Sequence, residues 1–436
     1  MKGALKWAVL VWVIVALAAV GYTWDNAGWD LVKWIRDSSG NVVIDADGDG
    51  TSDVSVSGSD GSVAITETVT AANLLMDDYK RGGGWSQKGT STAADRYTLV
   101  SPTRMAVRID GTIYAVSSQQ ELDLSAEATW DTTAGTDYRT AANRAGVDFY
   151  VYACEPSSGT APDLIVSANS TVPTGYTAAT SYKVGGFHGL CTAVGTIGGH
   201  DLTDFAQGDI LPDSIWDQSH RPVCSPEGMV YSEAADIWVD IYLASGTGAS
   251  TASANGGTIS DSRNWMDFVD DFGAVGKRLL TDHEFQLIAA GSNEETNIAG
   301  SADPVTTGGH SDTAGRRMIS DIGVEDACGA MWQWLLDQSY RFDGAANHTH
   351  DVTVSGDPET ATTGNPSGDV APAWAWENLP GSKGSFFRQG TYGDVKLRAG
   401  GYWGGGTGCG SRSRSAIYHR WNSLSSLGAR GCARSR

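Results

Sequence analysis

The final stretch of the chain, from Lys396 to Arg436, constrains the fold most strongly. It contains no Asp or Glu, although the whole chain carries a formal net charge of −21. Its cations are Lys396, Arg398, Arg412, Arg414, Arg420, Arg430, Arg434 and Arg436, and its aromatic side chains are Tyr402, Trp403, Tyr418, His419 and Trp421. Rigid rings mixed with small polar groups give contact area at low entropic cost. The stretch therefore predicts a binding surface that is displayed on a scaffold.

Composition indicates a large, β-rich chain. With 436 residues and 41% hydrophobic content, the chain can bury two or three cores. Its 55 Gly and 16 Trp favour strands and loops over a helical bundle. The sequence pI near 4.6 argues against nucleic acid as a partner, because phosphate binding needs a basic footprint.

The six cysteines are widely spaced and form no C-x-x-C pair, which argues against a zinc site. An even count in an exported chain allows three disulfides, and the alternative is small buried thiols. We favour free thiols for Cys154 and Cys328. For Cys409 and Cys432 we predict a disulfide.

The N-terminus has the pattern of an export segment. A short basic start precedes an uncharged apolar run from Trp7 to Tyr22, which is shorter than the roughly 20 residues that span a bilayer comfortably. Residues 1–24 therefore predict a signal peptide or a membrane anchor, with Ala16-Leu17-Ala18 as a cleavage signal. Either reading predicts an exported protein.

Residues 25–73 are polar and poor in large aliphatic side chains, which predicts a stalk. Asp45, Asp47, Asp49 and Asp53 occupy positions 1, 3, 5 and 9 of a calcium loop. Position 12 is Val56, where an EF-hand has a bidentate Glu. The spacing resembles thrombospondin type 3 and bacterial stalk repeats, so the sequence indicates either a calcium site or an ordinary Asp/Gly turn. No other cofactor is expected.

Residues 74–224 read as a β-rich spacer or assembly domain of short strands. The segments 105–109 and 112–116 flank Asp110-Gly111, which predicts a hairpin. No catalytic constellation occurs here. The isolated His188, His200 and His220 favour structural or surface roles.

Residues 225–436 show mixed patterning. Thr281 with Glu284 predicts a helix that begins in a capping box and ends near Gly291, with Phe285, Ile288 and Ala289 on one face. Trp332 and Trp334 alternate onto one side of an extended segment.

The segment 343–383, rich in Gly, Thr, Ala and Pro, predicts a long loop. His348 and His350 could ligate a metal as i, i+2 neighbours on a strand. No third ligand is identifiable.

Three motifs resemble formylglycine-generating enzymes: "GKRLLTDHEFQLIAAG" (276–291), "DACGAMWQW" (326–334), and "RAGGYW" (398–403) with "CGSRSRSA" (409–416). Their order implies an α+β fold in which residues 225–436 form a C-type lectin domain of the formylglycine-generating-enzyme-like subtype. A β-rich domain and an N-terminal hydrophobic segment would precede it.

The same region is similar to the variable proteins of diversity-generating retroelements, a group that includes receptor-binding proteins of phage tail fibres. This resemblance implies a variable region at about 398–432 in which randomised codons encode only NNY residues. The implied variable, ligand-binding positions are Tyr402, Gly404, Gly405, Gly408, Ser415, Ile417, Tyr418, His419, Asn422, Leu424 and Ser426. The implied fixed framework includes Trp332, Trp334, Trp403, Arg412, Trp421 and Arg430, with Arg412 and Arg430 bonding carbonyls or carboxylates inside the fold.

The resemblance implies a hypervariable receptor-binding protein at a virion or cell surface, with a surface protein or glycan as ligand and a homotrimer by analogy. One alternative is a formylglycine-generating-type oxidase. Such an enzyme needs two reactive cysteines close together, and Cys409 has none nearby. The other alternative is a sugar-binding lectin. The usual calcium motifs are absent, Glu155-Pro156-Ser157 being the nearest, so a sugar would bind without calcium through Tyr402, Tyr418 and Trp421.

Overall fold

The computed structural model describes four strands between residues 33 and 65, residues 84–116, 118–159 and 161–341, two strands at 374–376 and 386–387, and residues 393–436. The chain divides into two compact units, Met1–Leu74 and Leu75–Arg436. The first unit contains β1 (Lys33–Arg36), β2 (Val42–Asp45), β3 (Val54–Val56) and β4 (Val63–Ile65), paired antiparallel in sequence order. Sequence reasoning predicted a polar stalk here and missed this four-stranded meander.

Several sequence predictions fall outside the described residues. They concern the apolar run 7–22, the part of the calcium loop that follows Asp45, and the pair His348 and His350. Asp45 itself is the last residue of β2. Within the described ranges, no helix combines the length and apolar character needed to cross a membrane.

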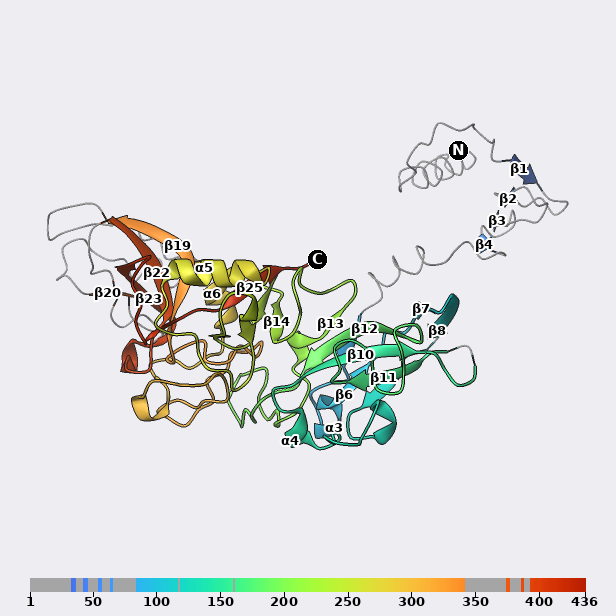
Figure 1. Ribbon diagram of the computed structural model, residues 1–436, viewed down its shortest axis with the longest axis horizontal. Helices are drawn as coiled ribbons and strands as arrows, with labels where there is room; N and C mark the ends of the chain where they lie inside the picture. The colour runs from blue at the N-terminus through green and yellow to red at the C-terminus, as the bar shows by residue number, and fades with distance from the viewer. Residues whose placement is uncertain are drawn as a thin grey trace, which may run out of the picture. The chain divides into compact units, whose positions relative to one another are not determined.

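The N-terminal half of the second unit is built from short strands and single helical turns, where η denotes a 3-10 turn (Figure 1). Its elements are β5 (Ser86–Gln87), α3 (Ala93–Arg96), β6 (Thr98–Val100), β7 (Met105–Ile109), β8 (Thr112–Val116), β9 (Glu121–Asp123), η1 (Glu127–Thr129), α4 (Ala141–Arg144), β10 (Asp148–Cys154), β11 (Asp163–Ser167), β12 (Ser181–His188), η2 (Pro212–Ser214) and β13 (Trp216–Asp217). The sheets run β11-β10-β12-β13, β5-β6-β9 and β7-β8. Their inward side chains share one core, which includes Leu99, Phe149 and Phe187.

The hairpin predicted at Asp110-Gly111 is confirmed. Met105 pairs with Val116 and Ile109 with Thr112, so two residues connect β7 to β8. Asp110 and Gly111 both have positive φ, 45° and 82°. Two successive residues with positive φ match the right-handed twist of paired strands, which is why Asp-Gly suits this turn.

The C-terminal half carries the longer strands and the two longest helices in the described residues. Its elements are β14 (Met229–Ser232), β15 (Ile237–Asp240), β16 (Ala244–Ser245), η3 (Gly248–Ser250), β17 (Ala252–Ser253), α5 (Trp265–Ala274), β18 (Arg278–Leu279), α6 (Asp282–Ile288), η4 (Ala299–Ser301), β19 (Trp332–Arg341), β20 (Trp374–Trp376), β21 (Phe386–Phe387), β22 (Gly393–Gly400), η5 (Gly406–Gly408), β23 (Gly410–His419), β24 (Leu427–Gly428) and β25 (Gly431–Arg434). β20 lies inside the segment 343–383 that was predicted as a loop. The described residues are thus mostly strand and loop, with little helix.

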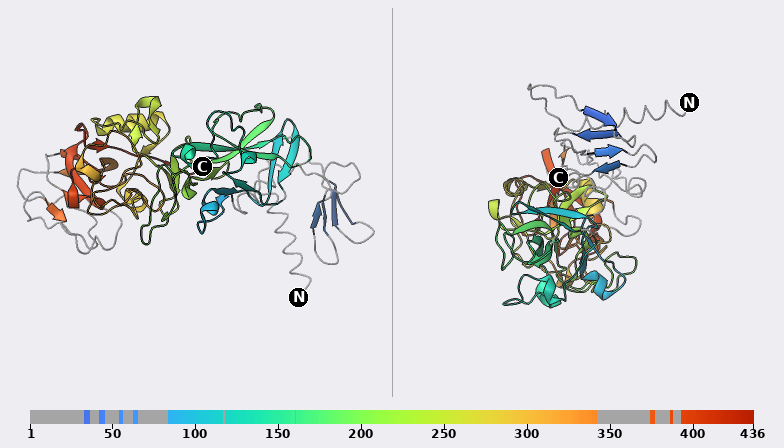
Figure 2. Two further views of the ribbon diagram at one scale, coloured as in Figure 1. Left: turned by 90° about the horizontal axis from the view of Figure 1, so that it is seen from below. Right: turned by 90° about the vertical axis from the view of Figure 1, so that its right-hand side faces the viewer.

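Two sheets organise this half. The larger runs β20-β21-β23-β22-β19-β24, and the smaller runs β14-β15-β25-β18. β25 pairs with both β15 and β18, so the last strand closes a sheet whose other members lie about 150 to 200 positions earlier in the chain. Figures 1 and 2 show β22 and β23 at the opposite end of this unit from β7 and β8, with β25 between them.

The predicted helix at 281–291 is confirmed as α6. The Thr281 side chain accepts a hydrogen bond from the Glu284 backbone N–H, and the Glu284 carboxylate accepts one from the Thr281 N–H. Phe285, Ile288 and Ala289 are all fully buried on the inner face. This helix packs against β19, β22 and β23 of the larger sheet. The cap at Thr281 therefore stabilises a helix that supports this sheet.

Thr281→Ala is expected to lower the free energy of unfolding by about 1 kcal/mol, because the mutation removes one half of the capping box. Chemical denaturation followed by tryptophan fluorescence measures the change. Thr281→Ser is the matched control, since it keeps the hydroxyl acceptor. Equal losses for the two variants would contradict a capping role for Thr281.

The three isolated histidines have structural roles, as predicted. His188 is buried, with Nδ1 2.8 Å from Asp148 Oδ1 and Nε2 2.9 Å from the Tyr242 hydroxyl. His200 Nδ1 accepts a hydrogen bond from the Leu202 N–H. His220 packs edge-on against the Tyr231 ring. The His188 bonds join β10 and β12 to the segment after β15, and so tie the two halves of this unit together.

Candidate binding face

The predicted variable region begins on a strand pair whose register is interrupted twice. Between the pairs Lys396↔Tyr418 and Arg398↔Ser415, β23 contains one residue more than β22. Between Ala399↔Arg414 and Gly400↔Gly410, it contains three more. Extra residues in one strand of a pair form bulges that break the alternation of side chains between the two faces. Residues 410–416 are consequently buried in succession, and 417–419 emerge at the surface.

The arginines of β23 point into the protein. Arg414 is fully buried, and its Nε donates a hydrogen bond to the carboxylate of Asp282, the first residue of α6. Its Nη1 donates to the carbonyls of Ser411 and Ser413 at 2.8 and 2.9 Å. Arg412 is also buried. These cations therefore act inside the fold rather than on its surface.

Arg430 lies just before β25 and is 1% exposed. Its guanidinium donates to the backbone carbonyls of Asp240, Ile241 and Glu325, and Nε lies 3.3 Å from Gln333 Oε1. Burial lowers the pKa of Arg430 to about 10. One side chain thus joins β15, β19 and the segment before β19.

Hydrogen bonds attach the loop between β22 and β23, and the start of β23, to Ala330 and to the segment 294–297. The Trp403 N–H donates to the Ala330 carbonyl at 2.9 Å, and the Trp403 carbonyl accepts a hydrogen bond from Asn297. The Glu294 carboxylate accepts from the Ser411 N–H and hydroxyl at 3.1 and 2.6 Å. Sequence reasoning missed Glu294, Asn297 and Asp282, because no local signal marks a contact over more than 100 residues of chain.

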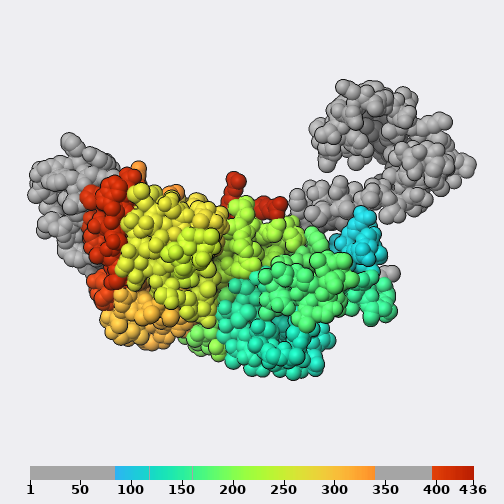
Figure 3. Space-filling view, viewed as in Figure 1, coloured from blue at the N-terminus to red at the C-terminus, as the bar shows by residue number. Residues whose placement is uncertain are grey.

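The exposure of the implied variable positions follows the strand geometry. Gly404 and Leu424 are exposed, and Tyr402, Gly405, Gly408, Ile417, Tyr418, His419, Asn422 and Ser426 are half-buried. They lie on two segments, 402–408 and 417–426, which we call the candidate face. The Trp265 N–H of α5 donates to the Arg420 carbonyl at 3.0 Å, so α5 borders this face. In Figure 3 the red surface of β22 and β23 adjoins the yellow surface of α5.

Ser415 is the exception, and its assignment as a ligand-contacting position is wrong. It is 0% exposed, and its hydroxyl accepts a hydrogen bond from Arg398 Nη2 at 2.7 Å. The one-residue bulge between Ser415 and Tyr418 shifts which side chains face inward.

Neighbouring atoms also limit which side chains fit at Gly405, another implied variable position. A Cβ added there would lie 2.5 Å from the Cys409 sulfur and 3.1 Å from the Tyr402 carbonyl oxygen. Any side chain at position 405 therefore requires the loop to shift.

The implied framework tryptophans divide into two groups. Trp332 and Trp334 are 6% and 1% exposed in one cluster, which confirms that they share a side of the strand. Trp403 is half-buried against the separate cluster that contains Ala330 and Met331. Trp421, in contrast, is 64% exposed, and the Arg420 guanidinium lies 5.2 Å from its ring centre. Trp421 therefore lies on the surface beside the implied variable positions, and its role as a fixed residue there stays a prediction.

The predicted disulfide between Cys409 and Cys432 is wrong, since both are free, buried thiols. Cys409 precedes β23 with its sulfur 3.4 Å from the Tyr402 carbonyl, while Cys432 lies in β25 against the Leu279 carbonyl. Cys409 thus lies next to the larger sheet and Cys432 within the smaller one, so hydrogen bonding rather than a covalent clamp closes the region. Cys154 and Cys328 are also free and buried, as predicted.

Burial raises the pKa of the Cys409 thiol to about 12. Because the thiolate is the reactive form, we expect Cys409 to resist alkylation by iodoacetamide at pH 8 in the native protein and to react fully in denaturant. Mass spectrometry of the peptide containing Cys409 measures the modified fraction. Half-buried Cys224 is the internal comparison. Rapid native alkylation of Cys409, or a disulfide in the unreduced protein, would contradict this placement.

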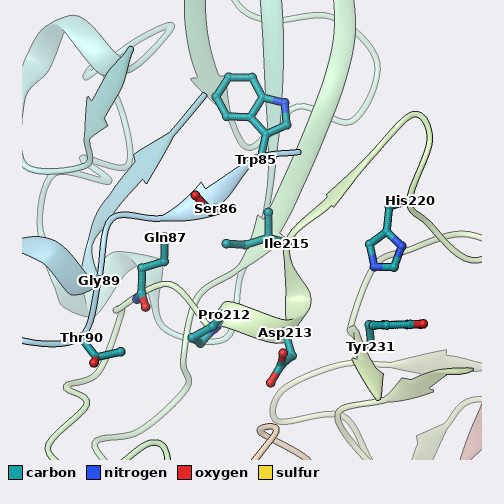
Figure 4. Close-up of a pocket in the computed structure, with 10 residues that line it drawn as sticks. All are labelled: Trp85, Ser86, Gln87, Gly89, Thr90, Pro212, Asp213, Ile215, His220 and Tyr231. Atoms are coloured by element: carbon teal, nitrogen blue, oxygen red, sulfur yellow. The ribbon is translucent and has the colours of Figure 1, made fainter. Parts of the chain in front are cut away.

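The structure contains a separate hollow outside the variable region. A cavity of about 370 Å³ is lined by Trp85, Ser86, Gln87, Gly89, Thr90, Pro212, Asp213, Ile215, His220 and Tyr231 (Figure 4). Burial raises the pKa of Asp213 to about 6. Across the described ranges, no group of three or more His, Cys, Asp or Glu side chains is arranged to hold a metal ion.

The fold and the face together define a class: a β-rich protein in which surface segments are carried on buried arginines and tryptophans. Comparison with known proteins makes this specific. Residues 98–217 match the family model described as the Mtd second domain. The chain is 29% identical over 286 residues, covering 59% of this chain and 71% of the relative, to the tail fiber receptor-binding protein of Bordetella phage BPP-1.

Solved structures agree with this result. The Major Tropism Determinant U1 and M1 variants superpose with TM-scores of 0.56 and 0.57 at 24% identity, covering 88% of this chain and 94% of theirs. The resemblance to tropism determinants and their C-type lectin-like fold, predicted from the C-terminal motifs, is thereby confirmed.

Proposed function

We propose that this chain is a receptor-binding protein of a virion, that its candidate face contacts a surface protein or glycan of the host cell, and that it performs no chemistry. One observation carries the proposal. The segments 402–408 and 417–426 reach the surface, whereas the side chains that attach them to the scaffold are buried. The similarity to a tail fiber receptor-binding protein supports the virion assignment.

The same separation supports diversification by a retroelement. A face that accepts many side chains cannot also supply the core, because large-to-small changes of buried groups cost several kcal/mol, about 2–5 each. Here Arg414, Arg430, Trp332 and Trp334 hold the fold together, and none is an implied variable position. Half-buried Tyr402 and exposed Leu424 can therefore change without loss of the scaffold.

Several finer features belong to the proposal. The C-terminal domain would be of the formylglycine-generating-enzyme-like subtype, because α6 and the motifs at 326–334 and 398–416 follow that order. Residues 74–224 would serve in assembly, and a homotrimer would present several faces at once. Calcium, if bound, would belong to the loop that starts at Asp45.

The test combines changes on the face with a measure of folding. A variant with Tyr402→Ser, His419→Asn and Leu424→Asn is expected to lose or change its adhesion to bacterial strains that the unmodified chain binds, while its melting temperature stays within a few degrees. A variant with Ile113→Asn, Tyr182→Asn and Val305→Asn changes exposed residues elsewhere and is the matched control. Unchanged adhesion of the face variant, or its unfolding, would contradict the proposal.

A glycan ligand bound without calcium is the second candidate, and the exposure of Trp421 favours it. A sugar ring packs its apolar face on an exposed aromatic ring. Trp421→Ala should then abolish adhesion that persists in a calcium chelator. If adhesion survives in this variant, the ligand is not a sugar that stacks on Trp421.

A further inference from the structure

Arg398, on β22, lies directly beneath the candidate face in an aromatic enclosure. It is 2% exposed. Its guanidinium carbon lies 5.2 Å and 5.8 Å from the ring centres of Trp332 and Trp334, and 4.0 Å from that of Tyr418. A cation over aromatic faces is attracted by the negative charge density of the rings.

This cation has no carboxylate partner among the described residues. Its Nη2 donates to the Ser415 hydroxyl, and its Nε–H has no hydrogen-bond acceptor in the described part of the chain. Burial lowers the pKa of Arg398 to about 9, so the group still carries its charge at neutral pH. A buried charge without a counterion is costly, and the rings and one hydroxyl compensate only in part. The site is therefore short of one acceptor.

The four side chains around the guanidinium differ in exposure. Trp332, Trp334 and Ser415 are buried, and Tyr418 alone is half-buried. Tyr418 sits where β23 emerges after its bulge, at the start of the segment 417–426. The Tyr418 ring consequently separates the guanidinium from solvent.

We propose that Tyr418 is the cover of a latent carboxylate site and that Arg398 is a fixed specificity-determining residue beneath the variable face. Variants with a small residue at position 418 would admit the carboxylate of an Asp or Glu side chain from a protein receptor. This inference rests on the proposed function of the face, and it names the ligand chemistry for one class of variants.

The chemistry favours a carboxylate, and the available space favours a protein side chain. A guanidinium presents planar paired N–H donors that match the two oxygens of a carboxylate. Loss of the Tyr418 ring frees the volume of a single side chain, which an Asp or Glu side chain can fill. An acidic sugar would have to place a whole substituted ring in the same space.

The experiment uses the full chain with Tyr418→Ser and two small probes, N-acetylglutamate amide and its neutral isostere N-acetylglutamine amide. Titration calorimetry is expected to show that the variant binds the glutamate probe at least about ten-fold more tightly than the glutamine probe, a difference that the unmodified chain lacks. Tyr418→Phe keeps the ring and is the matched control. Adding Arg398→Lys to Tyr418→Ser keeps the charge but removes the planar pair of donors, and should reduce the preference.

A second readout does not depend on affinity. Phenylglyoxal modifies accessible arginines, so mass spectrometry should find Arg398 protected in the unmodified chain and in Tyr418→Phe, and modified in folded Tyr418→Ser. Protection of Arg398 in Tyr418→Ser, or equal binding of the two probes, would overturn the proposal. Tighter binding of the methyl glycoside of N-acetylneuraminic acid than of the glutamate probe would also overturn the protein assignment. Because neither assay needs a receptor, these outcomes are separate from failure of the adhesion test.

Discussion

Replacing Arg430 by methionine is expected to lower the free energy of unfolding by about 3–5 kcal/mol, the cost of removing one partner from a buried charged network. Arg430 donates to three backbone carbonyls, and methionine fills similar space without any donor. The carbonyls of Asp240, Ile241 and Glu325 would lose these bonds in the interior, and each unsatisfied buried group carries a desolvation cost of about 1–3 kcal/mol. The loss should therefore be among the largest for a single substitution in this chain.

Urea denaturation followed by circular dichroism measures this loss. Arg434→Met, four residues further on, is the matched control, because Arg434 is exposed at the end of β25. The control should remain close to the unmodified chain. If the two substitutions destabilise the protein equally, Arg430 does not have the structural role assigned to it.

Asp282→Asn is expected to cost a comparable amount, about 3–5 kcal/mol, because the variant leaves the Arg414 cation buried without its carboxylate. Arg414 is 0% exposed and Asp282 is 1% exposed in this ion pair. Asparagine keeps the shape of Asp282 and removes only the charge, so the loss reports the electrostatic contribution. Because Arg414 lies on β23, the strand should also open more often.

Thermal unfolding gives the stability change, and amide hydrogen exchange of residues 410–419 gives the local opening. Glu121→Gln removes the charge from the exposed pair of Lys88 and Glu121 and is the matched control. Solvent screens such a pair, so it should change neither quantity. Faster exchange confined to residues far from β23 would contradict the assigned role of the buried pair.

Features set by a few neighbouring residues were predictable from the sequence. The capping box needs only Thr281 and Glu284, and the hairpin needs only Asp110 and Gly111, because these turns form from local hydrogen bonds and allowed backbone angles. The alternation of Trp332 and Trp334 follows equally from the period of a strand. The family motifs then supplied the arrangement of these elements in space.

Features set by distant residues were not predictable. Ser415 was assigned to the surface because the bulges of β23 change which side chains face inward, and no residue type marks a bulge in the sequence. The pairing of Cys409 with Cys432 failed because proximity in sequence does not show that one lies next to the larger sheet and the other within the smaller one. Some partners of the buried arginines, such as Asp282, lie more than 100 positions away.

The position of β25 has a consequence for how such a chain tolerates mutation. The strand follows the variable region in sequence, yet it fills the space between β15 and β18. A shift of reading frame anywhere between residues 402 and 426 would replace β25 and leave both neighbours with unpaired backbone groups. Faulty copies should therefore misfold and be degraded, while copies that differ only by substitution assemble. Under the proposed diversification, this architecture filters the variant chains for an intact reading frame before any of them reaches a receptor.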